Sequence, residues 1–221
     1  MPSHDLAAVL NALFDAERTV RRAHDELVDA DPGVMSALLD LLEKETRNAL
    51  DLDTVDEDES SLRLVRMAGL LGELQGARPV DLLVQILGSD EPEARHAAGE
   101  ALSELAWERF KEVALGVERA LERLPEGSPA LAELPYLLAE IPEPGVSRLL
   151  ARFLAHRDPD AVAAAIEALV EIGDPAALSL LQPLANDERK VQLEDEGGTQ
   201  GDATIAELVA EARALLSKRR P

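Results

Sequence analysis

The spacing of apolar residues along the chain predicts short helices throughout. Apolar side chains recur at positions 94, 97, 98, 101, 102 and 105, and again at 161, 164, 165, 168, 169 and 172. Intervals of three and four residues place each set on one face of a helix. Together with Gly and Pro as separators, the pattern predicts eleven helices, at about 4–29, 33–49, 60–75, 78–87, 91–107, 109–124, 129–140, 145–155, 159–172, 175–184 and 203–217.

These helices belong to an internal repeat. The segment 92–105 aligns without gaps to 159–172, and a related segment lies between them at 129–141. Each copy ends in Glu followed by Leu or Ile, at Glu73, Glu104, Glu140 and Glu171. A unit of two short helices cannot bury its apolar face alone, so neighbouring units must stack. We therefore expect an all-α fold, a right-handed α-solenoid of stacked helical hairpins.

We divide the chain into two parts. Residues 1–60 are expected to form an N-terminal helical cap with an acidic loop at 51–61, and residues 61–221 the repeat array, with an acidic Gly-containing loop at 186–202. The long first helix is amphipathic, and its apolar face can either close the end of the array or dock a second subunit; we favour the first. The acidic cluster before Leu62 lacks the Gly and the final Glu of a calcium-binding loop.

Composition agrees with helices and limits the partners. Among 221 residues there are 39 Leu, 35 Ala and no Cys, and 44 Asp and Glu face 22 Lys and Arg, for a net charge of −22. Half of that charge lies in residues 1–60. Such a charge opposes binding to nucleic acid and to anionic membranes. The 18 Arg against 4 Lys are typical of a bacterial or archaeal chain, and no apolar stretch predicts export or a membrane span, so we expect a cytoplasmic protein.

Candidate chemistry is sparse. The four histidines, His4, His24, His96 and His156, show no metal-ligand spacing. The sequence contains no phosphate loop, nucleophile elbow or dinucleotide motif. Abundant carboxylates alone do not form an acid–base pair. We therefore predict no catalytic residue, no metal site, no cofactor and no enzymatic activity.

The repeat resembles the HEAT repeat family, specifically the short bacterial kind similar to phycobilisome-lyase-type repeats. The resemblance is carried by Asp90, Pro92 and Arg95 in one unit, and by Asp158, Pro159 and Gly173-Asp174-Pro175 in another, together with the shared Ala and Leu positions. It implies that Arg95 pairs with the turn Asp. The equivalent position in the later unit is Val162, so the ladder of Asp/Arg pairs is incomplete.

In HEAT proteins the second helix of each unit lines the concave surface. On that basis we expect a glutamate column that is suited to a basic partner; it consists of Glu73, Glu100, Glu104, Glu140, Glu167 and Glu171. The alternative is a solvated face of helix-forming Glu residues. Trp107 and Tyr136 lie in the central units, where aromatic residues serve either interfaces or packing between repeats.

Our leading hypothesis is a non-enzymatic adaptor or scaffold. It would bind a protein partner with a basic or mixed surface along the acidic concave face, with neither nucleic acid nor membrane as a partner. One alternative is an acidic inhibitor or immunity-type protein that masks a basic enzyme. Another, implied by the resemblance, is a tetrapyrrole lyase or isomerase. The sequence leaves the oligomeric state open, and we favour a monomer.

Overall fold

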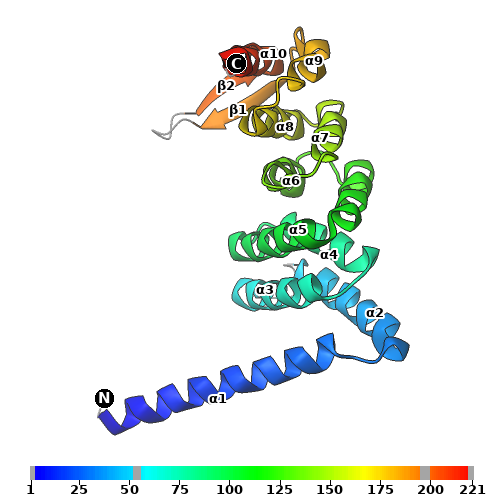
Figure 1. The fold of residues 1–221 in the computed structure, drawn as a ribbon. Coiled ribbons are helices and arrows are strands. Elements are labelled where there is room, and N and C mark those ends of the chain that lie inside the picture. Colours follow the sequence, from blue (N-terminus) through cyan, green and yellow to red (C-terminus); the bar gives the residue numbers. More distant parts are fainter. Residues whose placement is uncertain (1–2, 52–55, 195–199, 219–221) are drawn as a thin grey trace.

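The computed structural model describes residues 3–51, 56–194 and 200–218. In these residues the chain forms ten α-helices, one 3-10 helix and one β-hairpin (Figure 1). The elements in order are α1 Ser3–Val28, α2 Pro32–Ala49, α3 Glu57–Glu73, α4 Ala77–Leu87, α5 Pro92–Arg123, α6 Pro129–Ala139, α7 Val146–Leu154, α8 Pro159–Ile172, α9 Ala177–Leu181, the 3-10 helix Gln182–Leu184, β1 Lys190–Glu194, β2 Gln200–Thr204 and α10 Ile205–Lys218.

The helices stack in two layers. One layer contains α3, the first half of α5, α6 and α8, and we call it the second-helix layer. The other contains α4, the second half of α5, α7 and α9 (Figure 1). At Arg109 the backbone of α5 leaves the helical region, with φ −138° and ψ 48°, so α5 is two helices joined by a kink. The sequence predicted a boundary near residues 107–109 and left open whether the two helices are continuous or meet at a tight bend; the structure has the bend. The all-α solenoid is confirmed.

Local sequence explains where the helices begin and end. Pro occupies the first turn of α2, α5, α6 and α8, where its missing N–H costs nothing. Asp158 caps α8 by accepting hydrogen bonds from the backbone N–H groups of Asp160 and Ala161. Gly173 ends α8 with φ 72°, a left-handed conformation that a residue with a side chain adopts at a cost.

A single hydrophobic core runs between the layers. The shared repeat positions 94, 98, 101, 102 and 105 of α5 are buried, as are 161, 164, 165, 168 and 169 of α8. Two positions depart from the pattern: Ala97 is half-buried, and Ile172 lies 36% exposed at the end of α8. Alanine at most of these positions allows close helix approach, and Leu and Phe side chains fill the space between layers.

The C-terminal part corrects one prediction. The segment expected to be an acidic loop, 186–202, contains most of an antiparallel β-hairpin, in which Lys190 lies opposite Thr204 and Glu194 opposite Gln200. The hairpin is inserted between α9 and α10. The predicted acidic loop at 51–61 is also shorter than expected, because α3 begins at Glu57 with Asp56 as its N-cap. Residues 52–55 of that loop lie outside the described residues.

The N-terminal helix extends away from the array. Figure 1 shows α1 running beneath α3 and projecting on the same side as the hairpin. Much of its apolar face is exposed, namely Leu6, Val9, Leu10, Leu13, Phe14, Val20 and Leu27. The helix approaches α3 through its C-terminal part, where His24 meets Glu73. The apolar face of residues 6–14 therefore covers no part of the repeat array.

Candidate functional site

The glutamate column lies on the solvent-facing side of the second-helix layer. Glu73 ends α3, Glu104 lies on α5, Glu140 caps the C-terminus of α6 and Glu171 lies near the end of α8. All four are exposed, as are Glu100 and Glu167, the remaining members of the column. Because these helices are stacked neighbours (Figure 1), the carboxylates occupy equivalent positions on successive repeats.

Basic side chains are scarce on this surface. Neither α6 nor α8 contains a Lys or Arg. In the first half of α5 the only arginine before the kink is Arg95, and its Nε lies 3.0 Å from Glu133 Oε1 on α6. His96 lies 3.5 Å from Glu100. Acidic side chains therefore outnumber basic ones in the middle of the layer.

Two large aromatic side chains lie on the same layer. Trp107 of α5 is 61% exposed and Tyr136 of α6 is 41% exposed. The sequence left open whether these residues pack between repeats or face a partner. An indole that is mostly in solvent contributes little to packing between repeats. Trp107 therefore remains available for contact with another molecule.

Tyr136 and Glu167 connect α6 to α8. The Tyr136 hydroxyl donates a hydrogen bond of 2.6 Å to Glu167 Oε2. Partial burial raises the pKa of the Tyr136 phenol, and the hydrogen bond to Glu167 and the charges of Glu167 and Glu171 raise it further. The phenol consequently stays protonated at neutral pH and holds the Glu167 carboxylate in place.

A cavity of about 380 Å³ continues this surface between α8 and α10. The cavity is lined by three carboxylates, Glu167, Glu171 and Glu211, and by apolar side chains that include Val170 and Leu215. Sequence reasoning missed Glu211 and Leu215, because α10 was not aligned with the repeats. The cavity combines carboxylates with an apolar lining, an arrangement that suits a long cationic side chain.

Glu73 differs from the other members of the column. Its Oε1 lies 2.7 Å from Nε2 of His24 on α1. Glu73 therefore helps to hold α1 against the array, and the structure does not leave it as a free carboxylate. The structure groups Tyr136, Glu167 and Glu171 around one place, and it sets Glu73 apart at the N-terminal end.

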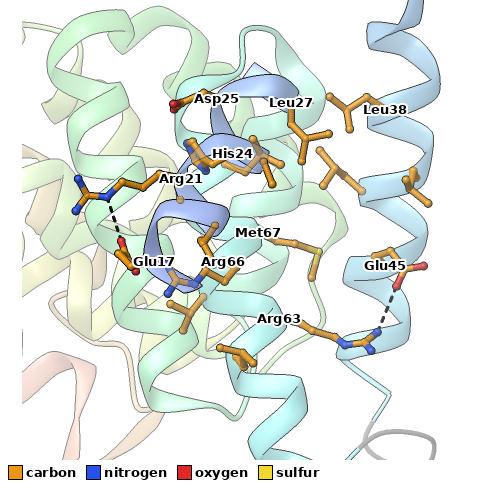
Figure 2. A pocket seen from close by; sticks show the side chains of 18 residues that line it. Glu17, Arg21, His24, Asp25, Leu27, Leu38, Glu45, Arg63, Arg66 and Met67 are labelled. Carbon is orange, nitrogen blue, oxygen red and sulfur yellow. Dashed lines mark hydrogen bonds and ion pairs between the residues drawn. The ribbon is translucent and has the colours of Figure 1, made fainter. Parts of the chain in front are cut away.

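A larger cavity, of about 790 Å³, lies between α1, α2 and α3 (Figure 2). Apolar side chains dominate its walls, among them Leu27, Leu38, Leu42 and Met67. Charged groups at its margin pair with one another; Arg21 donates to Glu17 at 3.2 Å, and Arg63 reaches Glu45 at 3.5 Å. No pattern in the sequence indicates this cavity, since it depends on where α1 crosses the array.

Arginine side chains hold the turns between repeats. The Nη1 atom of Arg95 donates to the carbonyl oxygens of Ser89, at 3.1 Å, and Asp90, at 3.4 Å. The resemblance implied a pairing with the carboxylate of the turn Asp. Among the described residues Arg95 instead binds the backbone of the turn and the Glu133 carboxylate, because its guanidinium extends toward α6.

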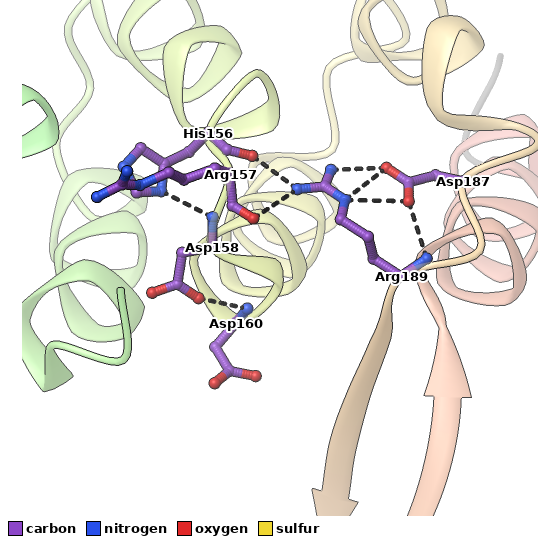
Figure 3. A network of polar contacts seen from close by, with 6 residues as sticks. All are labelled: His156, Arg157, Asp158, Asp160, Asp187 and Arg189. Carbon is purple, nitrogen blue, oxygen red and sulfur yellow. Dashed lines mark hydrogen bonds and ion pairs between the residues drawn. The ribbon is translucent and has the colours of Figure 1, made fainter. Parts of the chain in front are cut away.

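The later repeat uses an arginine from another element. His156 and Arg157 are the equivalents of Ser89 and Asp90, and Arg189 Nη1 donates to their carbonyl oxygens at 2.8 and 3.0 Å (Figure 3). Arg189 also pairs with Asp187 at 2.6 Å, and this hydrogen bond lowers the pKa of the Asp187 carboxyl. Arg189 thus takes the place of the repeat arginine, because the equivalent position in this unit is Val162. It also fixes the base of the hairpin.

Asp158 completes this network. Its Oδ2 accepts a hydrogen bond of 2.7 Å from the backbone N–H of Gly127, in the turn before α6. The carboxylate is almost fully buried. It therefore ties the start of α8 to the preceding repeat, and this role is structural.

The described residues contain no group of three or more His, Asp or Glu side chains placed to hold a metal ion. In the part of the chain that the structure covers, no helix is both long and apolar enough to cross a bilayer. His24 and His96 each contact a glutamate, and His156 Nδ1 accepts a hydrogen bond from the Asp158 backbone N–H. These three histidines therefore lie in separate places, with different partners.

Comparisons with known structures gave distant matches. Human deoxyhypusine hydroxylase in complex with glycerol is 18% identical, with 94% of this chain and 98% of that chain covered and a TM-score of 0.33. An engineered protein is also 18% identical, with 90% and 89% covered and a TM-score of 0.33. A second engineered protein is 19% identical, with 89% and 90% covered and a TM-score of 0.32. These scores are too low to support an argument about function.

A family model matches part of the sequence. No curated protein matches the chain. The model of HEAT repeats matches residues 130–193, which span α6, α7, α8, α9 and the first strand of the hairpin. The matched units have the same two-helix form as the units before them. Residues 130–193 therefore contain HEAT repeats.

Proposed function

We propose that this protein is a non-enzymatic scaffold that binds a basic segment of a partner protein along the second-helix layer. HEAT repeats suggest a scaffold for protein interaction. The observation that carries the finer proposal is the exposure of Trp107 and Tyr136 among the carboxylates of α5, α6 and α8. An exposed aromatic side chain that is surrounded by negative charges favours a cationic ligand.

The charge of the surface would set the rate and the specificity of binding. Negative carboxylates on successive helices add their fields, and α6 and α8 have no Lys or Arg to cancel them. A basic segment is steered toward such a surface, whereas an acidic one is repelled. This long-range attraction falls as salt rises, because the screening length shortens to about 8 Å at physiological ionic strength.

Trp107 would provide the short-range contact. Glu104 precedes it by three residues, so the carboxylate and the indole share one face of α5. An arginine side chain can stack on the indole and pair with Glu104 at the same time. The cavity between α8 and α10 offers a second position, where Glu171 and Glu211 can receive the end of a Lys or Arg whose stem lies on Leu215.

Selection from a random-peptide library tests the proposal without a known partner. We expect the immobilised protein to enrich peptides that are rich in Arg and Lys, and to release them at high salt. The Glu104→Lys and Glu171→Lys substitutions should each lower the affinity for the selected peptides by about tenfold, or about 1.4 kcal/mol. Glu143→Lys, in the turn between α6 and α7, is the control with the same charge change and should bind normally.

Two results would contradict the proposal. One is enrichment of neutral or acidic peptides, which would remove the electrostatic basis. The other is an equal loss of binding in all three variants, because net charge alone, and no particular surface, would then explain the effect.

A further inference from the structure

Apolar residues recur every seven residues along the whole length of α1. Leu6, Leu13, Val20 and Leu27 are spaced by seven residues, and Val9, Ala16 and Ala23 lie between them. Such spacing is typical of a helix that packs along another helix. The residues of this seam are exposed in the single chain; Leu13, for example, is 62% exposed.

The face runs directly into the large cavity between α1, α2 and α3 (Figure 2). Val20 and Leu27 belong both to the seam and to the cavity wall. Leu41 of α2 and Leu62 of α3 also line it, and they are 53% and 55% exposed. The N-terminal half of α1 thus offers an apolar ridge, and its C-terminal half borders an apolar groove.

The size of this surface matches a stable interface. Seven apolar residues of α1, with Leu41 and Leu62, are 39–62% exposed. At roughly 150–200 Å² for a fully exposed large residue they present about 700–900 Å². Typical monomers expose apolar patches of about 300–600 Å², whereas a standard complex buries about 800 Å² on each partner.

Charge favours a second copy of this chain as the occupant. The chain as a whole carries −22, but α1 contains five acidic and three basic residues. Three acidic and three basic side chains border the cavity, the basic ones being Arg21, Arg63 and Arg66. The α1 helix and the margin of the cavity are therefore close to neutral, so two copies can approach each other there with little net repulsion. An anionic membrane is a poorer occupant, because α1 lacks the excess of Lys and Arg that such helices carry.

We propose that two copies of the chain form an antiparallel dimer through α1. The N-terminal half of each α1 lies on the groove between α1, α2 and α3 of the other copy. In this register Leu6 meets Leu27 of the second copy, and Leu13 meets Val20 of the second copy, because both pairs are centred between residues 16 and 17. Each surface serves as ridge and as groove, as a two-fold interface requires.

Light scattering during size-exclusion chromatography tests the dimer. The wild-type chain of 23.8 kDa should elute with twice that mass at about 100 μM. Leu13→Asp should elute as a monomer with unchanged helical circular dichroism, since Leu13 touches little in the single chain. Asn11→Asp adds the same charge on the opposite side of α1 and should remain a dimer.

A cysteine probe tests the register. The chain has no cysteine, so a single introduced one reports only on its own position. Ala16→Cys, on the seam at the centre of the pair, should form a disulfide-linked dimer under mild oxidation. Arg18→Cys, two residues away on the outer side, should link at least tenfold less.

Three outcomes would overturn the proposal. The first is a wild-type monomer at about 100 μM, where an interface of this size is expected to form. The second is a dimer that Leu13→Asp leaves intact. The third is a monomer that binds vesicles of phosphatidylcholine and phosphatidylglycerol and loses this binding in Leu13→Asp. That result would show that the face binds a lipid surface. None of these results bears on peptide binding by the second-helix layer, because that proposal rests on other residues.

Discussion

Replacing Arg189 by Ala is expected to release the C-terminal hairpin from the repeat array. The Arg189 guanidinium donates to the carbonyl oxygens of His156 and Arg157 and pairs with Asp187. Its side chain is 33% exposed and that of Asp187 is 16% exposed, so solvent screens the pair in part. Two carbonyls that lose their donor cost about 1 kcal/mol each, and the partly screened ion pair about 1 kcal/mol more, for a total of about 3 kcal/mol.

Hydrogen exchange is the suitable assay, because stacked repeats open locally as well as together. The backbone N–H groups of Ile205 and Ala206 donate to the carbonyls of Arg189 and Asp187, so they report on this junction. A loss of about 3 kcal/mol predicts exchange about 100-fold faster at these amides. Amides of α3 should exchange as in the wild type.

The matched control is Arg148→Ala. Arg148 is exposed on α7 and makes no ion pair with any described residue, so its loss should change stability by less than about 0.5 kcal/mol. If Arg189→Ala left the exchange of Ile205 and Ala206 unchanged, the idea that Arg189 replaces the missing repeat arginine would be refuted. Acceleration spread equally over α3 would refute the local character of the effect.

Other substitutions test packing and the pH response. Gly116→Ala should destabilise by about 1–3 kcal/mol in urea denaturation, since its Cβ would lie 2.3 Å from Val80 Cγ1. Gly99→Ala has room for its Cβ and should instead stabilise by about 0.5–1 kcal/mol. Asp187→Asn should destabilise at pH 7, and the difference from wild type should vanish as pH falls through the lowered pKa of Asp187. A difference that persisted in strong acid would contradict an ionic role for Asp187.

The repeat helices could be predicted because local and global signals agree there. Apolar positions in α5 and α8 align over fourteen residues, with Pro at both starts, and nearly all of them are buried. The kink at Arg109 coincides with the predicted boundary, although no Gly or Pro marks it.

The hairpin was not predictable in the same way. Its second strand, Gln200–Thr204, contains Gly and Asp and has Thr as its only β-branched residue. Its stability depends on contacts with α8 and α10, and on Arg189, which lies 33 residues from one of its carbonyl partners. The sequence revealed the missing arginine at Val162, but it gave no sign of which residue takes over its contacts.

The candidate surface was predicted in part. Exposed Glu residues follow from the helical period, and the exposure of Trp107 agrees with one of the two interpretations that the sequence allowed. Glu211 and the cavity beside it required the position of α10, which the insertion of the hairpin determines. Sequence also showed that α1 is amphipathic, but only the structure showed that its apolar face is uncovered.

The fluorescence of Trp107 tests the central claim most directly, because it is the chain's only tryptophan and lies on the proposed surface. On titration with an Arg-rich peptide of about 20 residues, we predict a blue shift of the Trp107 emission and protection of the indole from quenching by acrylamide. Glu104→Lys and added salt should weaken both changes, and a Glu-rich peptide should produce neither. Binding of the basic peptide, measured by its own label, with no change at Trp107 and no response to salt would contradict the account.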